Sequence, residues 1–491
     1  MPKKQFPSNP SLVHFKHQAK DLLKAIRESA PEAVARFQEF HRSLRLDTPP
    51  ALSEAQLVVA REYGFASWGK LREYLEATDH YKCAPHKVST TSDSANHWAD
   101  EFLQLTCLTY GSDNPSRREK ARQIWADHPE LHGADIYIAA ATGDIAAARD
   151  LLAKDPTLAR ARGGPYHWEP LLYTAYSRFD STKANFSTLE IAALLLKHGA
   201  DPNSAYLWEG ICLFTALTGA FGEGESGPTN QPPHQYEKEL ATLLLTAGAD
   251  PNDGQALYNR MFTKGASHLE LLFAHGLGLP HKGPWPKRLG GKLDSPEQML
   301  AYQLHWAASL GHLDRIQLFA EHGVDLNRAS HGKSAYEAAL LAGNQEIADY
   351  LVEKGAQKTK LDPLKAFSAA CMSGDREEAL SLIEQHPELL ESSKPRQTQL
   401  VTDAAGNHRL EAIRLMAELG FDINALGRNT ALHEAAWAGD LEMIELLLEL
   451  GADTTTLDRA HQATPLQWAE YNHQSEAAAR LRLAAPPQPP V

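Results

Sequence analysis

The chain has 491 residues, and at roughly 100 to 200 residues per globular domain this length predicts two to four domains, unless an internal repeat extends one architecture. Hydrophobic residues make up 43% and charged residues 22% of the chain, which excludes disorder as its main state. Asp and Glu number 62 against 48 Lys and Arg, a net charge of -14, so the overall field repels polyphosphate and argues against a nucleic-acid partner.

Residues 1–80 are expected to form an N-terminal leader of three or four amphipathic helices. Charges at Lys16, Lys20 and Asp21 interrupt the apolar positions near the start, so this segment is not expected to act as a signal peptide. No later segment reaches the ~18 consecutive apolar residues that a membrane span requires. The sequence therefore predicts a cytoplasmic protein without a membrane partner.

The chain contains four cysteines, which are Cys83, Cys107, Cys212 and Cys371. They share no C-x-x-C or other metal-ligand spacing and are expected to be reduced, small apolar residues. His14 and His17 lie one turn apart on a predicted leader helix, but no third metal ligand is near them in the sequence. We therefore expect no metal and no cofactor.

Residues 81–96 are polar and rich in turn-forming residues, so they are expected to form a linker. A degenerate helix pair is expected at 97–133, where it would cap the segment that follows. Residues 134–485 are dominated by an internal repeat, and the Pro-rich tail at 486–491 cannot continue a helix.

The first repeated phrase is Leu-Leu-Leu-Lys-His-Gly-Ala-Asp-Pro-Asn at 194–203, which returns almost unchanged at 243–252. Weaker copies end at later glycines, which are Gly276, Gly323, Gly355, Gly420 and Gly451. The spacing of these copies is close to 33 residues. Such a period indicates a stack of similar units rather than several unrelated domains.

The second phrase, Leu-His-x-Ala-Ala, lies upstream at 304–308 and 432–436, and a Thr-Pro-Leu start appears at 464–466. These residues resemble the ankyrin repeat, whose T-P-L-H-x-A-A phrase and period of about 33 they reproduce. The leader resembles the helical segment that precedes ankyrin arrays in many bacterial proteins. The resemblance implies a binding protein that recognises a protein or peptide partner through its concave face and turn tips.

The sequence pattern of each repeat unit predicts two helices. Thr430 or Thr464 can cap the first helix, Pro465 suits its first turn, and Gly451 can adopt the left-handed conformation after the second. One helix pair cannot bury its apolar face alone, so the units must stack into an all-α ankyrin-repeat solenoid. About ten units are expected, at 134–164, 165–203, 204–252, 253–283, 300–328, 329–360, 361–393, 394–424, 425–457 and 458–485.

Residues 222–227 read Gly-Glu-Gly-Glu-Ser-Gly and match the dinucleotide-binding pattern G-x-G-x-x-G. They follow a predicted helix rather than a strand, and their two glutamates stand where phosphates would bind. We therefore interpret the match as chance.

Two predicted units depart from the repeat pattern. The second inserts residues 178–187 between its helices, and the third inserts residues 222–235 at the same place. Inserts in one loop of adjacent units are expected to emerge side by side, where they could wall a pocket. The same units carry the aromatic turns Tyr-His-Trp-Glu at 166–169 and Tyr-Leu-Trp-Glu at 206–209.

Three interpretations of these aromatic residues stay open. In the first, the tryptophans fill gaps between irregular units. In the second, the region binds a partner through anchors on the predicted units; the candidates are His167, Trp168, Trp208, Tyr258, Arg260, His305 and Trp306. In the third, Glu169 and Glu209 form the acid and base of a glycosidase-like hydrolase. For the protein as a whole, we predict a non-enzymatic binding function and assign no catalytic residue.

Overall fold

The computed structural model describes residues 4, 6–7, 10–41, 50–89, 97–180 and 185–484. The predicted tail at 486–491 lies outside these residues, as do 90–96 of the predicted linker and 181–184 of the first insert. Contacts divide the chain into two units. Unit 1 comprises Met1–Gly222, Pro233–Ala256 and Leu279–Ser295, and unit 2 comprises Glu223–Pro232, Leu257–Gly278 and Pro296–Val491.

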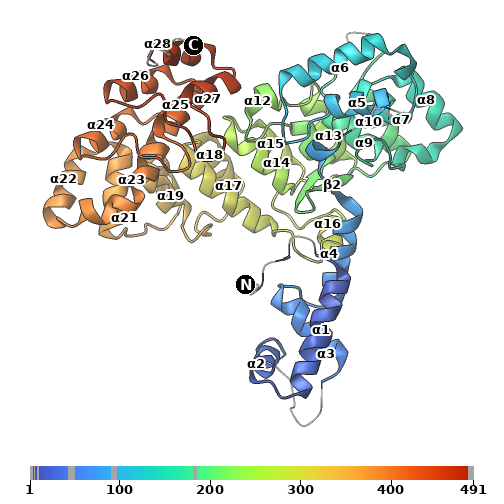
Figure 1. The fold of residues 1–491 in the computed structure, drawn as a ribbon, viewed down its shortest axis with the longest axis horizontal. Helices are drawn as coiled ribbons and strands as arrows, with labels where there is room; N and C mark the ends of the chain where they lie inside the picture. The colour runs from blue at the N-terminus through green and yellow to red at the C-terminus, as the bar shows by residue number, and fades with distance from the viewer. Residues whose placement is uncertain are drawn as a thin grey trace, which may run out of the picture. The chain divides into compact units, whose positions relative to one another are not determined.

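The leader of unit 1, drawn in blue in Figure 1, contains α1 (Leu12–Arg27), α2 (Pro31–Phe40), α3 (Leu52–Glu62) and α4 (Trp68–Tyr81). Each helix turns an apolar face inward, and Phe15, Phe37 and Phe65 meet in one core. Glu62 is buried beside this core, where its carboxylate accepts a hydrogen bond of 2.8 Å from Nε of Arg36. The predicted amphipathic helices of the leader are therefore present.

After the leader, unit 1 continues as a stack of short helices. They are α5 (His97–Thr106), α6 (Pro115–Asp127), α7 (Ile136–Thr142), α8 (Ile145–Lys154), α9 (Pro170–Tyr176), α10 (Thr188–Lys197), α11 (Ala216–Phe221) and α13 (Glu237–Thr246). Helices α5, α7, α9 and α11 pack one against the next. Fully buried alanines such as Ala139, Ala140 and Ala175 allow this close approach. Three 3-10 helices accompany the stack, η1 (Pro85–Lys87), η2 (Pro129–Leu131) and η3 (Pro156–Arg160).

Unit 1 also contains a small sheet, which corrects the all-α prediction. Strands β2 (Ala205–Trp208) and β3 (Cys212–Thr215) form an antiparallel hairpin, and β1 (Lys82–Cys83) pairs with β2 in parallel. The strand order is β1-β2-β3. The residues of β2, Ala-Tyr-Leu-Trp, include the aromatic residues that strands favour. Lys82 and Cys83, within the predicted linker, thus contribute an edge strand to the hairpin of a predicted repeat unit.

The stretch Leu279–Ser295 belongs to unit 1 and contains α16 (Trp285–Arg288). Trp285 is buried with Leu207 of β2 and Ala77 of α4 in one apolar cluster. Its indole Nε1 donates to the carbonyl oxygen of Asn203 at 2.8 Å. This stretch therefore joins the leader to the hairpin.

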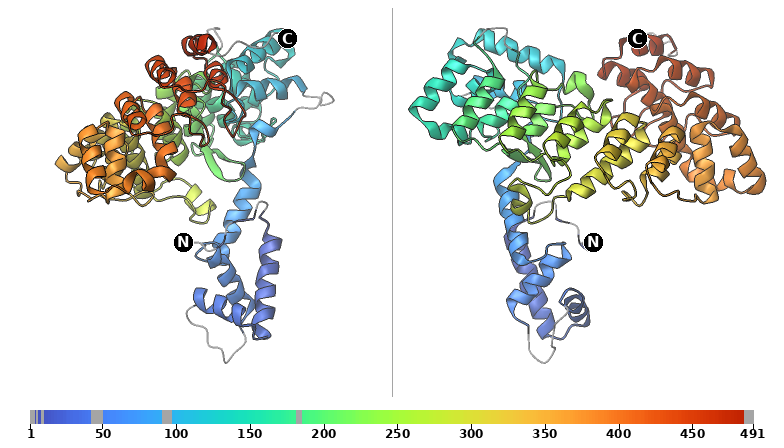
Figure 2. Two further views of the ribbon diagram at one scale, coloured as in Figure 1. Left: turned by 60° about the vertical axis from the view of Figure 1, so that its left-hand side comes forward. Right: turned by 180° about the vertical axis from the view of Figure 1, so that it is seen from behind.

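Unit 2 consists almost entirely of helix pairs, which Figure 1 shows in chain order from yellow to red and Figure 2 shows from two further sides. Its first helices are α17 (Pro296–Leu310), α19 (Ala335–Leu341), α21 (Pro363–Ser373), α23 (Leu389–Gly406), α25 (Ala431–Ala438) and α27 (Pro465–Tyr471). Consecutive members contact each other, and we call them the first-helix row. Their second helices are α18 (Leu313–Glu321), α20 (Gln345–Glu353), α22 (Arg376–Gln385), α24 (Leu410–Glu418), α26 (Leu441–Glu449) and α28 (Ser475–Ala484).

Four short elements that have not yet been described also precede α17 in the sequence. They are α12 (Gly227–Asn230), α14 (Gly254–Asn259), η4 (Arg260–Phe262) and α15 (Ser267–Ala274). Helix α14 contains one boundary between the two units.

In the described ranges, no helix combines the length and apolar character needed to cross a bilayer.

The local signals of the repeat act as predicted. The Thr464 side chain accepts from the backbone N–H of Gln467 at the start of α27, and Pro465 occupies the first turn. Gly451 follows α26 with a φ of 84°, in the left-handed region.

Candidate functional site

The predicted site residues fall into two groups. His167, Trp168, Glu169, Trp208 and Glu209 belong to unit 1, and Tyr258, Arg260, His305 and Trp306 belong to unit 2. The two inserts are divided in the same way, because Glu223–Pro232 of the second insert belongs to unit 2. Their expected side-by-side arrangement stays a prediction.

Trp168 is a buried packing residue with 1% of its surface exposed. It ends a tight turn in which the N–H of Gly163 donates to its carbonyl oxygen. Its ring stacks on Tyr206 with centroids 4.6 Å apart and also contacts Tyr176. This position favours the packing interpretation for Trp168, since a partner cannot reach its ring.

His167 and Glu169 flank Trp168. His167 is exposed and has a φ of 51°, a left-handed conformation that is uncommon for a residue with a side chain. Glu169 is half-buried, and its carboxylate accepts a hydrogen bond from the Ser204 hydroxyl. Burial raises the pKa of Glu169 above its ordinary value.

Trp208 ends strand β2 and Glu209 follows it, and residues of η1 contact both. The Trp208 ring stacks on His86 with centroids 4.9 Å apart, and its Nε1 donates to the carbonyl oxygen of Thr109 at 3.0 Å. Glu209 forms an ion pair with Lys87 and lies 3.2 Å from Nε2 of His86, and the Lys87 hydrogen bond lowers the pKa of this carboxyl. The chain's own residues 82–87 therefore occupy this part of the predicted binding surface.

The hydrolase hypothesis requires Glu169 and Glu209 to share a substrate site. Their pKa values move in opposite directions, as those of an acid and a base would. The largest cause of each pKa shift is nevertheless structural: it is burial for Glu169 and the hydrogen bond from Lys87 for Glu209. Neither residue lines either of the two cavities described below.

Tyr258 and Arg260 of unit 2 are tied to the second insert. The Tyr258 hydroxyl donates to Glu225 at 2.5 Å. Nη1 of Arg260 donates to Glu223 at 2.8 Å, and both of these side chains are about nine-tenths buried. Arg260 therefore neutralises a buried carboxylate, which is a structural role.

His305 and Trp306 lie on α17 and are half-buried. His305 is 5.5 Å from His331, ring to ring, and Trp306 is 6.2 Å from Tyr302. Burial, followed by the charges of His331 and Lys333, lowers the pKa of His305 to about 4. His305 is therefore neutral near pH 7.

Further along the first-helix row, the structure shows aromatic residues that were not among the predicted anchors. Trp437 of α25 and Tyr471 of α27 stack with centroids 6.1 Å apart and an interplanar angle of 24°. Tyr471 is 52% exposed, and Trp468 lies 5.8 Å from Trp437. Trp437 follows an Ala-Ala pair and Tyr471 stands at the equivalent position of the next copy, so aligning the copies on the second phrase would have found both.

Two carboxylates accompany these rings on the same row. Asp403 of α23 and Glu434 of α25 accept hydrogen bonds from the side-chain amides of Gln399 and Asn429. Burial raises the pKa of Asp403 to about 6 and also raises that of Glu434. The row thus combines aromatic rings with acidic groups.

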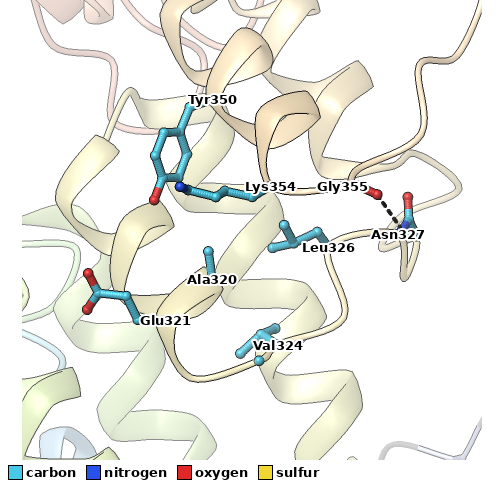
Figure 3. Close-up of a pocket in the computed structure, with 9 residues that line it drawn as sticks. Ala320, Glu321, Val324, Leu326, Asn327, Tyr350, Lys354 and Gly355 are labelled. Atoms are coloured by element: carbon cyan, nitrogen blue, oxygen red, sulfur yellow. Dashed lines mark hydrogen bonds between the residues drawn. The ribbon is translucent and has the colours of Figure 1, made fainter.

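One cavity among the described residues measures about 470 Å³ and lies between α18 and α20 of unit 2. Figure 3 shows Lys354 beside the Tyr350 ring, with its Nζ 5.1 Å from the ring centroid. The same figure shows the Asn327 amide donating to the carbonyl oxygen of Gly355. Lys354 is thus paired with Tyr350, and Asn327 with Gly355. The cavity is therefore better explained as a gap between two neighbouring helix pairs than as a ligand site.

The second cavity measures about 580 Å³ and lies in unit 1, between the end of the leader and the turn that carries His167. Among the described residues, no three His, Cys, Asp or Glu side chains gather closely enough to hold a metal ion.

A family model for ankyrin repeats, in three copies, matches residues 295–362 and 367–458. No curated protein matches the chain. The matched residues cover α17 to α26 of unit 2 except 363–366 at the start of α21, within the stack of helix pairs described above. Ankyrin repeats are in general protein-interaction modules. Residues 295–362 and 367–458 are therefore similar to ankyrin repeats.

Proposed function

We propose that the protein is a non-enzymatic binding protein that recognises a protein or peptide partner through the first-helix row of unit 2. The observation that carries this proposal is the stack of Trp437 of α25 on Tyr471 of α27, because Tyr471 is 52% exposed and Trp437 is half-buried. Tyr and Trp dominate the energetics of protein interfaces. An aromatic pair with one exposed member, held by two packed helices, is suited to anchor a partner.

The row also offers a chemical preference. Asp403 and Glu434 have amide donors, and no ion pair engages either carboxylate in the described part of the chain. A Lys or Arg side chain of a partner would compensate these partly buried charges. His305 and Trp306, at the other end of the row, extend the same surface and remain candidate contacts.

We further infer that the array extends beyond the matched residues, to about ten units over 134–485. In unit 1, Asn203 donates to the carbonyl oxygen of Gly248 and accepts from the N–H of Asp250. In unit 2, Asn424 makes the same two bonds to Gly451 and Asp453. Equal bonds at equal positions of the repeated phrase favour one kind of unit throughout.

The proposal is tested with a Trp437→Ala, Tyr471→Ala double variant. Partners captured by the wild-type chain are identified and purified, and their affinity is measured by isothermal titration calorimetry. We expect the double variant to bind at least about tenfold more weakly, a loss of about 1.4 kcal/mol or more. Trp98→Ala is the matched control, because Trp98 is 41% exposed and lies in unit 1. Equal affinity for the double variant and the wild type would refute the assigned surface.

The hydrolase hypothesis remains as a second candidate because the pKa values of Glu169 and Glu209 are displaced in opposite directions. Turnover of a panel of aryl glycosides that is lost in both Glu169→Gln and Glu209→Gln would favour it. Absence of turnover by the wild-type chain would contradict the hydrolase hypothesis and leave binding as the proposed function.

A further inference from the structure

The 580 Å³ cavity of unit 1 is lined by two cationic side chains and two histidines. It is lined by the end of α4, by β1 and by the turn after η3, which place His80, Lys82, Arg162 and His167 around it. Asp79 is the one carboxylate among its lining residues. Such a concentration of basic groups contrasts with the net charge of -14 of the whole chain.

Arg162 is held in place without a carboxylate. Its Nε donates to the carbonyl oxygen of His167 at 2.8 Å, and its Nη1 donates to the carbonyl oxygen of His80 at 2.9 Å. Nη1 also lies 2.7 Å from Nε2 of His80. The guanidinium centre is 5.3 Å from the Tyr81 ring centroid. Within the described ranges no ion pair engages Arg162, and Nη2 makes no hydrogen bond there.

A second guanidinium adds to the positive potential. Arg288 of α16 lies 5.4 Å from the centroid of the Tyr81 ring, so two cations contact one aromatic side chain. Burial lowers the pKa of His80, and the charges of Arg162 and Arg288 lower it further. Burial and the two guanidinium charges thus favour a neutral His80, and the charge of Asp79 opposes them.

We propose that this cavity binds the phosphate or carboxylate group of a small organic anion, with Arg162 as its main contact and Lys82 as the second. Arg162 presents an N–H group at a fixed position, which lowers the entropic cost of binding. Lys82 is exposed and has no carboxylate partner in the described part of the chain. A volume of about 580 Å³ suits a small organic molecule. The site lies in unit 1 and does not depend on the proposed function of unit 2.

Isothermal titration calorimetry of the full chain tests the proposal with four probes at matched ionic strength: inorganic phosphate, glucose 6-phosphate, citrate and uncharged glucose. We expect binding of at least one of the three anions and none of glucose. Preference for the phosphates or for citrate identifies the anionic group. Binding of glucose as tightly as glucose 6-phosphate would overturn the proposal, as would the absence of binding by every anion.

Variants locate the site. Arg162→Ala is expected to weaken anion binding at least about tenfold, and Lys82→Ala about threefold or more. Arg160→Ala is the matched control, because Arg160 is exposed, ends η3 and does not line the cavity. Lys82 makes no hydrogen bond through its side chain among the described residues, so its removal tests the site without disturbing the fold. Anion binding that survives both Arg162→Ala and Lys82→Ala, or that falls equally in Arg160→Ala, would overturn the assignment.

Discussion

Trp168 and Tyr206 stack at 4.6 Å between centroids, with an angle of 28° between their rings. Each ring is 1% exposed. Trp168 ends the turn before α9, and Tyr206 lies on β2 before α11, so the stack joins two successive predicted units. These aromatic turns therefore act as an internal contact between units.

Removal of the Trp168 side chain is expected to destabilise unit 1 strongly. Trp168→Ala should lower the free energy of unfolding by about 3 to 5 kcal/mol, because it leaves a large cavity among buried rings, and Trp168→Phe should cost less. Urea unfolding followed by circular dichroism measures both. Trp98→Ala, at an exposed tryptophan of the same unit, is expected to cost under about 1 kcal/mol. A stable Trp168→Ala protein that no longer binds its partner would instead make Trp168 a contact residue.

The helical content of the chain could be predicted because its signals are local. The helix-capping threonine and the proline and glycine at helix ends act within a few residues, and Thr464 and Gly451 behave accordingly. The small sheet could not be predicted in the same way. Strand β1 has two residues, and its partner Leu207 lies more than 120 positions along the chain from Lys82. Nothing in a two-residue segment specifies such a distant pairing.

The candidate site shows the same limit. Aromatic type alone did not distinguish Trp168, which is buried, from Tyr471, which is exposed. Arg260 looked like a surface anchor, but its carboxylate partner Glu223 comes from an insert 37 residues earlier. Burial and ion pairing at these positions depend on irregular segments, for which the repeat pattern offers no template.

Asn203 and Asn424 make equivalent hydrogen bonds in two different repeats, so removal of either side chain should cost a similar amount of folding free energy. Asn203→Ala and Asn424→Ala each delete one donor and one acceptor between neighbouring turns, which should lower the free energy of unfolding by about 1 to 2 kcal/mol. Chemical unfolding of the two variants measures these costs. Asn185→Ala, at an exposed asparagine, is the control. A cost at Asn424 without one at Asn203 would argue against one kind of unit throughout the array.

The raised pKa of Asp403 predicts a dependence of stability on pH. The folded protein holds the Asp403 proton up to about pH 6, whereas an unfolded Asp loses it near its ordinary value of 3.8, so Asp403 lowers the stability as the pH rises from about 4 through 6. Asp403→Asn removes this effect. Its advantage over the wild type in free energy of unfolding should grow by about 1 kcal/mol between pH 5 and pH 8.

Urea unfolding at the two pH values measures that advantage. Asp349→Asn is the matched control, because Asp349 lies exposed on α20 of the same unit. A constant difference between Asp403→Asn and the wild type at pH 5 and pH 8 would show that Asp403 titrates normally.

The Gly-Glu-Gly-Glu-Ser-Gly segment offers a comparison of two neighbouring glutamates. Glu223 is 6% exposed and accepts from Arg260, whereas Glu225 is exposed and accepts from Tyr258. Glu223→Ala leaves a buried guanidinium without this carboxylate and should lower the free energy of unfolding by about 3 to 5 kcal/mol. Glu225→Ala should cost about 1 kcal/mol or less. A Glu223→Leu, Arg260→Met double variant should recover most of the loss, since apolar residues can replace a buried ion pair. Equal costs for the two single variants would mean that the Glu223–Arg260 pair does not stabilise unit 2.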